Sequence, residues 1–284
     1  MTAVAFLILL LIGLPIGLVL CLAALVFIID SGNPLLLDSY ALKLFTSLDN
    51  FGLLAIPLFI LVGELMNGAG VTTRLIRLAA IFVGALRGGL AYINLLANML
   101  VASILGSATA QIAMMSRVMV PEMERAGYER EFAAGLTAFG GLLGPIIPPS
   151  IVFVVYAVLA QVAVRDMLIA GILPGLMLSG LFILTLAVLG WRHAYPRGAR
   201  LDWAARWRAA RAALPMLAIP LVIIGTILGG FGSPTEGAAM GAVAAALIGF
   251  FHTRTLKLRD LPAILLRTGL NPALVLFLVA AAWV

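Results

Sequence analysis

The sequence is poor in charge, cysteine and histidine, and each shortage excludes a class of protein. Only 11% of the 284 residues are charged, and there is one cysteine, Cys21, so no internal disulfide is possible. The two histidines, His193 and His252, lie in polar connections, and no H-E-x-x-H or G-x-S-x-G motif occurs. We therefore expect neither an enzyme nor a bound cofactor.

Apolar residues are unusually abundant in the sequence. They make up 63% of the chain, against roughly 45–50% in a soluble domain. Uncharged stretches cover residues 1–29, 88–116, 132–164, 167–191, 212–235, 237–251 and 268–284. Most reach the ~20 residues that a membrane-spanning helix needs. The sequence thus predicts an all-α polytopic membrane protein, and its net charge of +6 does not indicate nucleic-acid binding, because the basic residues sit in short loops beside the spans.

The loops are asymmetric in charge, which predicts an orientation. Segment 192–211 holds six arginines and one acid, 252–267 and 74–87 are also basic, and 30–50 is acidic. The positive-inside rule places the basic segments and the N-terminus in the cytoplasm and the acidic segment outside. Residues 1–29 are expected to form one retained span rather than a cleaved signal peptide, and residues 200–211 a short helix on the membrane surface.

Stretch 88–116 is predicted to be a re-entrant helical hairpin. A single crossing would turn the six-arginine segment outward, whereas two full crossings would need ~40 residues. Its centre, 105–109, reads Leu-Gly-Ser-Ala-Thr, as in a tight turn. Irregular backbone at membrane depth must be buried in protein or line a cavity. The hairpin tip is therefore a candidate site.

Stretch 132–164 is predicted to be an interrupted helix. Its centre, 140–150, carries three glycines, at 140, 141 and 144, and three prolines, at 145, 148 and 149. Proline removes a backbone donor and disfavours helical geometry at the preceding residue, so the helix must open here. Interrupted helices mark substrate and ion sites in secondary transporters.

A weak internal repeat divides the chain. Span, linker and span at 1–29, 30–50 and 51–66 parallel those at 236–251, 252–267 and 268–284, with linkers of opposite charge, as an inverted repeat requires. We expect scaffold helices of repeat one at 1–87, a transport-domain hairpin and interrupted helix at 88–164, connecting spans at 165–235, and the incomplete start of repeat two at 236–284. The second repeat lacks a hairpin, so a longer protein is expected.

Five motifs, in order, carry a family resemblance: PLFILVGELM at 57–66, GSATA at 106–110, PEM and GY at 121–128, LGPIIPPS at 143–150 and GSPTEG at 232–237. Together they resemble the large membrane subunit, of DctM type, of tripartite ATP-independent periplasmic (TRAP) transporters. The resemblance implies a sodium-driven elevator-type carrier of small organic acids, such as dicarboxylates, keto acids or sialic acids, in the bacterial inner membrane. Its implied partners are a small four-helix membrane subunit and a periplasmic binding protein, besides membrane lipid.

Two other readings of the function stay open. One is a carrier of the ion-transporter superfamily that works without a binding protein. The other is a channel, because a re-entrant loop can also serve as a selectivity filter. An inverted repeat favours alternating access over a channel.

The hairpin tip and the helix break supply the candidate site residues. A helix that starts near Ser107 would direct its amides at a carboxylate, so substrate binding is assigned to Ser107, Ala108, Thr109, Pro149 and Ser150. Oxygen donors suit Na⁺ as they suit other hard cations, so a sodium site, partly of backbone carbonyls, is assigned to Ser103, Gly106, Ser107, Gly144, Ile147 and Pro148. The structural alternatives are a small-residue helix contact at the tip, with Asn98 and Ser103 in interhelical hydrogen bonds, and a proline kink at the break.

Two acids, Glu64 and Glu236, stand in otherwise apolar spans. A carboxylate inside a membrane span is a functional candidate by default. Both lie near span ends, however. We expect structural roles, with Glu64 reaching the interface or an arginine and Glu236 at a helix start.

Overall fold

The computed structural model describes residues 1–33, 35–192, 195 and 202–283, and over this part the chain forms helices and no strand. Five helical runs are long and apolar enough to cross a membrane: Phe51–Gly68, Val164–Gly190, Trp203–Leu228, Pro234–His252 and Leu258–Ala282. The predicted all-α polytopic class is confirmed.

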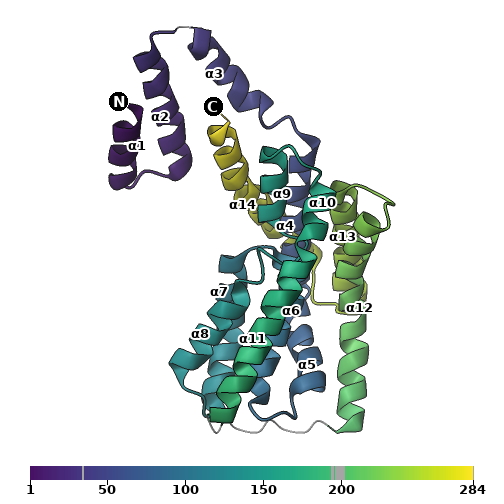
Figure 1. The fold of residues 1–284 in the computed structure, drawn as a ribbon. Coiled ribbons are helices and arrows are strands. Elements are labelled where there is room, and N and C mark those ends of the chain that lie inside the picture. Colours follow the sequence, from purple (N-terminus) through teal and green to yellow (C-terminus); the bar gives the residue numbers. More distant parts are fainter. Residues whose placement is uncertain (34, 193–194, 196–201, 284) are drawn as a thin grey trace.

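The N-terminal span predicted over residues 1–29 is wrong in its continuity. The structure has two shorter helices, α1 (Thr2–Leu11) and α2 (Ile16–Ser31), which pack against each other (Figure 1). Gly13 adopts a left-handed φ of 85°, and Pro15 occupies the N-cap of α2. Proline has no N–H to continue a helix, and glycine enters left-handed geometry without strain, so the chain reverses here.

A group of long helices forms the main core. The helix α4 (Ala55–Gly68) follows a short 3₁₀ turn at Phe51–Leu54 and packs against α13 (Pro234–Leu247) and α14 (Leu261–Ala282). Next to it, α12 (Trp203–Leu228) packs against α13 and α5 (Val71–Val83). Buried apolar side chains from α4, α5, α12 and α13 belong to one cluster.

The pairing of these helices fits the predicted inverted repeat. The first repeat contributes α2 and α4, joined through α3 (Leu35–Thr46), and the second contributes α13 and α14. Across the repeats α2 packs on α14 and α4 packs on α13, while α4 and α14 pack on each other. Exchanging the two repeats turns the contact of α2 with α14 into that of α4 with α13, and leaves the contact of α4 with α14 unchanged.

The predicted hairpin and interrupted helix pack against this core, because Ile93, Met115 and Val154 of their helices belong to the same buried cluster. The hairpin consists of α6 (Gly89–Leu105) and α7 (Ala108–Arg125), and the interrupted helix of α8 (Arg130–Gly141) and α9 (Ile151–Leu159). In Figure 1 α6 and α7 meet in a turn at mid-height, where α8 ends and α9 begins. The chain then continues through α10 (Val164–Ala170) and α11 (Ile172–Arg192).

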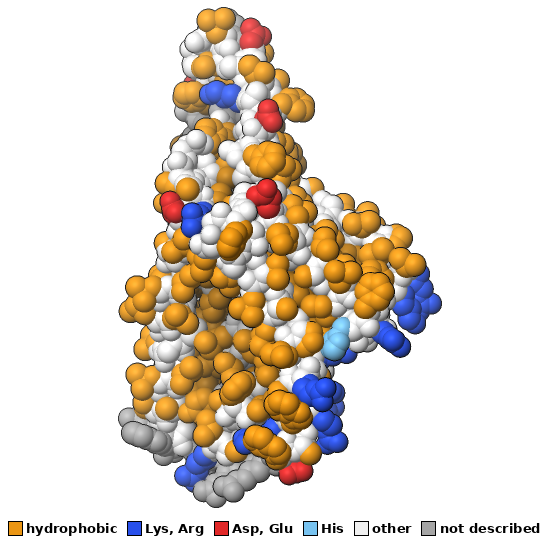
Figure 2. Space-filling model, turned by 90° about the vertical axis from the view of Figure 1, so that its right-hand side faces the viewer, with side chains coloured by type: hydrophobic (Ala, Val, Ile, Leu, Met, Phe, Trp, Pro, Cys, Tyr) orange, Lys and Arg blue, Asp and Glu red, His pale blue; other side chains and the backbone are white. Residues whose placement is uncertain are grey.

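Basic side chains gather at one end of the molecule. Figure 2 shows Lys and Arg mainly toward the lower end, with broad apolar surface above it. The expectation of a separate surface helix at 200–211 is wrong from Trp203 onward, because Arg206, Arg208 and Arg211 lie in the first turns of α12 itself. The alanine- and arginine-rich sequence there favours helix strongly enough to extend the span. Residues 193–194 and 196–201 of this basic segment lie outside the described residues.

Candidate functional site

The turn of the hairpin touches the break in the interrupted helix. Gly106, with a φ of 58°, is so close to the break that a Cβ atom there would lie 3.2 Å from the Pro149 carbonyl oxygen and the Ile151 nitrogen. A Cβ on Gly144 would lie 2.8 Å from Gln111 Oε1 and 3.3 Å from the Ser107 carbonyl carbon. Glycine at both positions allows the two backbones to meet, so the two predicted features form one contact.

The N-terminus of α7 opens on the larger cavity of the site. Ser107 is the N-cap residue, but its side chain makes no capping hydrogen bond, and its hydroxyl lies 3.3 Å from Thr109 Oγ1. Ser107, Ala108 and Thr109 line a cavity of about 950 Å³. The first amides of a helix carry partial positive charge, so this terminus can accept an anion. Three of the predicted substrate residues thus lie together on one cavity.

The other two predicted substrate residues lie elsewhere. Ser150 is fully buried, donates its hydroxyl hydrogen to the Pro145 carbonyl at 2.6 Å, and caps α9 by accepting from the Phe153 N–H at 3.5 Å. Pro149 lines a different pocket. Neither residue lines the larger cavity, although the Pro149 carbonyl lies against Gly106 of the tip, and their assignment to substrate binding stays a prediction.

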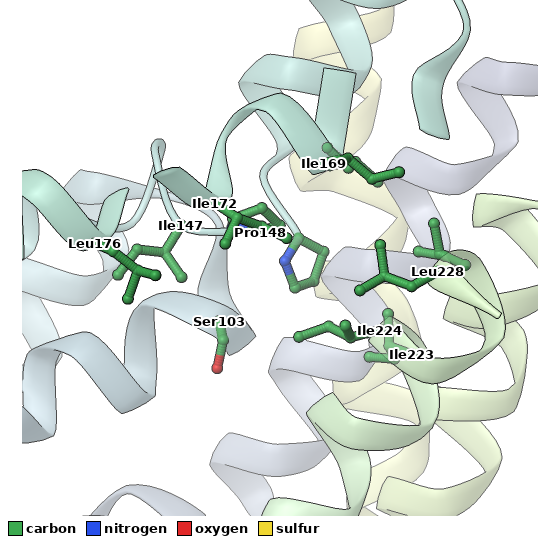
Figure 3. A pocket seen from close by; sticks show the side chains of 12 residues that line it. Ser103, Ile147, Pro148, Ile169, Ile172, Leu176, Ile223, Ile224 and Leu228 are labelled. Carbon is green, nitrogen blue, oxygen red and sulfur yellow. The ribbon is translucent and has the colours of Figure 1, made fainter. Parts of the chain in front are cut away.

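The predicted sodium residues also divide into two groups. Gly106, Ser107 and Gly144 meet at the contact between tip and break. Ser103, Ile147 and Pro148, with Pro149, face a smaller apolar pocket of about 290 Å³, which is completed by α10, α11 and α12 (Figure 3). The Ser103 hydroxyl donates to the Leu100 carbonyl of its own helix at 2.8 Å. The six residues therefore do not lie together at one place, and their assignment to a sodium site stays a prediction.

A buried polar chain holds the hairpin to α8. Gln111 Nε2 donates to Asn98 Oδ1 at 2.9 Å, Asn98 Nδ2 to Asn94 Oδ1 at 2.8 Å, and Asn94 Nδ2 to Thr137 Oγ1 at 2.7 Å. All four side chains are fully buried. Interhelical hydrogen bonds of this kind contribute about 0.6 kcal/mol each in membranes. The interhelical alternative raised for Asn98 is confirmed, whereas Asn94, Gln111 and Thr137 were not among the sequence-predicted residues.

One oxygen of these four hydrogen-bonded side chains has no hydrogen-bond donor among the described residues. It is Oε1 of Gln111, which is buried and directed at Gly144, beside the hairpin tip. A buried carbonyl oxygen without a donor costs about 1–3 kcal/mol, or accepts a cation or water instead. The only signal in the sequence was an amide inside an uncharged stretch.

Charged and metal-binding side chains contribute little to the tip. Within the described residues no group of three or more His, Cys, Asp or Glu could hold a metal ion. Glu64 lines the larger cavity and lies 3.7 Å from Arg267 of α14, and Glu236 forms a capping box with Ser233. Both acids therefore have the structural partners expected of them. Glu64 is the one acid among the described residues that line the cavity at the tip.

Membrane-capable helices, a helical hairpin and a broken helix that meets its tip define a polytopic membrane protein of the transport class. The family model for the DctM component of the tripartite ATP-independent periplasmic transporter matches residues 3–284, and the chain belongs to this family. The resemblance seen in the sequence is confirmed.

Curated relatives of known name agree with this assignment. The chain is 36% identical to the C4-dicarboxylate TRAP transporter large permease protein DctM of Rhodobacter capsulatus, over 96% of this chain and 65% of that protein. It is 37% identical to the 2,3-diketo-L-gulonate permease YiaN of Escherichia coli (96% and 64%) and 33% identical to the sialic acid permease SiaM of Vibrio cholerae (94% and 62%). These relatives are transport proteins rather than enzymes, and the chain spans just under two thirds of their length.

Proposed function

We propose that this protein is the carrier subunit of a TRAP transporter, which moves a small organic acid anion into the cell together with Na⁺. The observation that supports this most directly is the contact between hairpin tip and helix break beside a polar cavity. Membership of the DctM family and relatives named for carboxylate substrates support the same activity.

The substrate carboxylate binds at the start of α7 in this proposal. The amides of the first turn and the hydroxyls of Ser107 and Thr109 offer hydrogen-bond donors to an anion, and the first turn holds no acid to repel it. The cavity of about 950 Å³ has room for a small organic acid.

The coupling Na⁺ binds where the tip meets the break. Gln111 Oε1 lies there, beside the Ser107 backbone and the Gly141 carbonyl around Gly144, and the proposal adds the Ser107 hydroxyl as a further ligand. All are oxygens, as a hard cation requires. A sodium ion here would draw tip and break together and would strengthen anion binding at the neighbouring start of α7.

The hairpin enters the membrane from the cytoplasmic side and returns to it in this proposal. Both its ends lie at the same end of the molecule, and the tip stops at mid-height (Figure 1). The hairpin and interrupted helix then move as a unit against α4, α12 and α13, in an elevator-type cycle. A small four-helix membrane subunit and a periplasmic binding protein complete the transporter in the bacterial inner membrane, with the N-terminus in the cytoplasm.

Uptake by reconstituted protein tests the proposal. The complete gene product, with its small subunit, is placed in liposomes, and purified binding protein is added outside with a labelled dicarboxylate, keto acid or sialic acid. We expect uptake that needs both an inward Na⁺ gradient and the binding protein. Ser107→Ala should raise the Na⁺ concentration for half-maximal uptake, whereas Ser179→Ala on α11, whose hydroxyl only bonds the Gly175 carbonyl of its own helix, should not.

The alternatives are separate outcomes of the same assay. Uptake that is equally fast without the binding protein would indicate a carrier that works alone. Downhill flux that is independent of Na⁺ and does not saturate would indicate a channel. An unchanged Na⁺ dependence in Ser107→Ala would remove the hairpin tip from the sodium site.

A further inference from the structure

The smaller, apolar pocket lies beside the break and shares no lining residue with the larger cavity. Its walls are Leu168 and Ile169 of α10, Leu176 of α11 and Ile223 of α12, and Pro148 of the break lies at its inner side (Figure 3). The only polar side chain in its lining is Ser103, whose hydroxyl is bonded to its own helix. The lining is therefore poorly suited to bind a polar solute.

The pocket opens to the outer surface of the helices. Ile169, Leu176 and Leu228 at its edge are 39%, 59% and 42% exposed. The neighbouring outward positions of α11 are also apolar, with Leu173 and Met177 each 67% exposed. An apolar surface of this kind is suited to membrane hydrocarbon, and the space of about 290 Å³ opens onto it. An empty apolar space beside fluid chains would lose dispersion contacts on all its walls, so a chain fills it.

The guanidinium group of Arg165 lies beside the pocket. Arg165 precedes Leu168 and Ile169 by three and four residues, so it lies on the same face of the chain as these two lining residues. Its Nη2 donates to the carbonyl of Leu228, a third lining residue, at 3.1 Å. That bond uses one of five guanidinium N–H groups, and no ion pair within the described part of the chain involves Arg165.

The position of this cation is unusual for the predicted topology. Arg165 is the second residue of α10, and this helix lies in the upper half of Figure 1, away from the basic end, on the side where the loops are acidic. The positive-inside rule gives no reason for an arginine there. A phosphate of the outer leaflet would supply the missing negative partner, since guanidinium groups bind phosphates through paired hydrogen bonds.

We propose that the apolar pocket and Arg165 form a specific phospholipid site, in which one acyl chain enters between α10, α11 and α12 and Arg165 holds the phosphate. The occupant is a diacyl phospholipid because such a lipid offers both an acyl chain to the apolar pocket and a phosphate to Arg165. The site joins the hairpin and break to α12 through the lipid, independently of the substrate cavity.

Lipid retention by the purified protein tests this site. Phosphatidylglycerol is titrated onto protein in detergent micelles, and native mass spectrometry measures the fraction that carries one lipid. Arg165→Gln keeps an amide donor for the Leu228 carbonyl but loses the charge, and we expect it to weaken binding about five- to tenfold. Arg165→Lys should restore most of the affinity. Arg77→Gln, an exposed arginine on α5, is the matched control and should bind like the wild type.

Two further measurements distinguish the contribution of the phosphate to lipid binding from that of the acyl chains. Ile224→Trp, which fills the pocket without touching the charge, should weaken lipid binding although Arg165 is intact. Diacylglycerol should bind wild type and Arg165→Gln alike, and millimolar inorganic phosphate should not displace the phospholipid.

Equal lipid retention by the wild type and by Arg165→Gln would overturn the proposal, as would displacement by inorganic phosphate alone. Circular dichroism checks that each variant is folded. If Arg165→Gln melts early, Ile224→Trp decides, and undiminished binding there would refute the site.

Discussion

Gly106 is the residue on which the contact between hairpin and break depends most directly. An alanine there would hold a left-handed φ of 58° and press its Cβ against backbone atoms of Pro149 and Ile151. Backbone atoms cannot move aside as a flexible side chain can. We expect Gly106→Ala to lower the free energy of unfolding by about 1–3 kcal/mol.

Denaturant titration in mixed micelles measures this change. Gly180→Ala is the matched control, because it lies in α11 with nothing within 4 Å of its Cβ position. Alanine favours helix over glycine by about 1 kcal/mol, so the control should be neutral or stabilised. Equal effects of the two substitutions would mean that the tip does not press on the break.

Gln111 joins two opposing effects in one side chain. Its amide nitrogen donates to the side chain and carbonyl of Asn98, while its buried Oε1 has no donor. Gln111→Met keeps the length of the side chain but removes both the amide donor and the unpaired oxygen. We expect a net loss of about 1–2 kcal/mol, because Asn98 loses a buried donor. Unchanged stability would show that the unpaired oxygen costs as much as the amide contributes.

The matched control for Gln111→Met is Thr185→Val on α11. The Thr185 side chain is exposed, and its hydroxyl donates only to the Leu181 carbonyl of its own helix. Its replacement should change the free energy of unfolding by less than about 0.5 kcal/mol. Thermal melting in the presence and absence of Na⁺ gives a second readout, since only Gln111→Met should reduce stabilisation by the ion.

Single residues of the site were predictable only to the extent that local chemistry decides their place. Gly106 and Ser107 could be found because small residues in an apolar stretch indicate a turn. The sequence could not show that Ser103 and Pro149 face a different pocket, since this depends on which way the break turns in space. Gln111 escaped attention because an amide in a helix has no signature of its own until its neighbours are known.

At the scale of elements, helix breaks at glycine and proline decided which predictions succeeded. The turn between α6 and α7 and the break between α8 and α9 lie at the predicted breaking residues, which interrupt otherwise uniform spans, while the re-entrant course of the hairpin stays a prediction. The single N-terminal span was wrong because hydropathy alone ignores what Gly13 and Pro15 do to the backbone. The start of α12 was wrong for the opposite reason, since charge was taken to end a helix that alanine and arginine continue.

The orientation of the hairpin in the membrane can be tested through its ends. Single cysteines replace Arg87, Arg125 or Asp49 in a Cys21→Ser background, which removes the one native thiol. If the hairpin returns to the cytoplasm, a membrane-impermeant maleimide should label positions 87 and 125 only in inside-out vesicles and position 49 only in right-side-out vesicles. Labelling of 87 and 125 from opposite sides would mean that the hairpin crosses the membrane.

At the scale of the whole molecule, the hairpin and interrupted helix form one group that meets the group of long helices both through the packing of α6 on α5 and α4 and at the apolar pocket. The hairpin and break contribute Ser103 and Ile147, and α12 contributes Ile223 and Ile224 (Figure 3). The repeat pairing of α4 with α13 and α2 with α14 lies on the other side of this division. The sequence indicated the two groups through its repeat. Their packing could not be foreseen, because it depends on side chains from distant helices.

An elevator-type cycle requires the two groups to slide past each other. A reducible cross-linker with a short flexible spacer between Ser103→Cys and Ile224→Cys should therefore arrest uptake by the complete gene product, because it ties the hairpin to α12. A linker between Phe51→Cys and Thr235→Cys joins two positions within one group, where the Thr235 hydroxyl donates to the Phe51 carbonyl at 3.4 Å. That linker should leave uptake intact. Cleavage by reductant should restore the first variant, which separates arrest from damage by the substitutions. Full uptake with the first linker in place would mean that the hairpin and α12 move together, and the elevator would have to divide the molecule elsewhere.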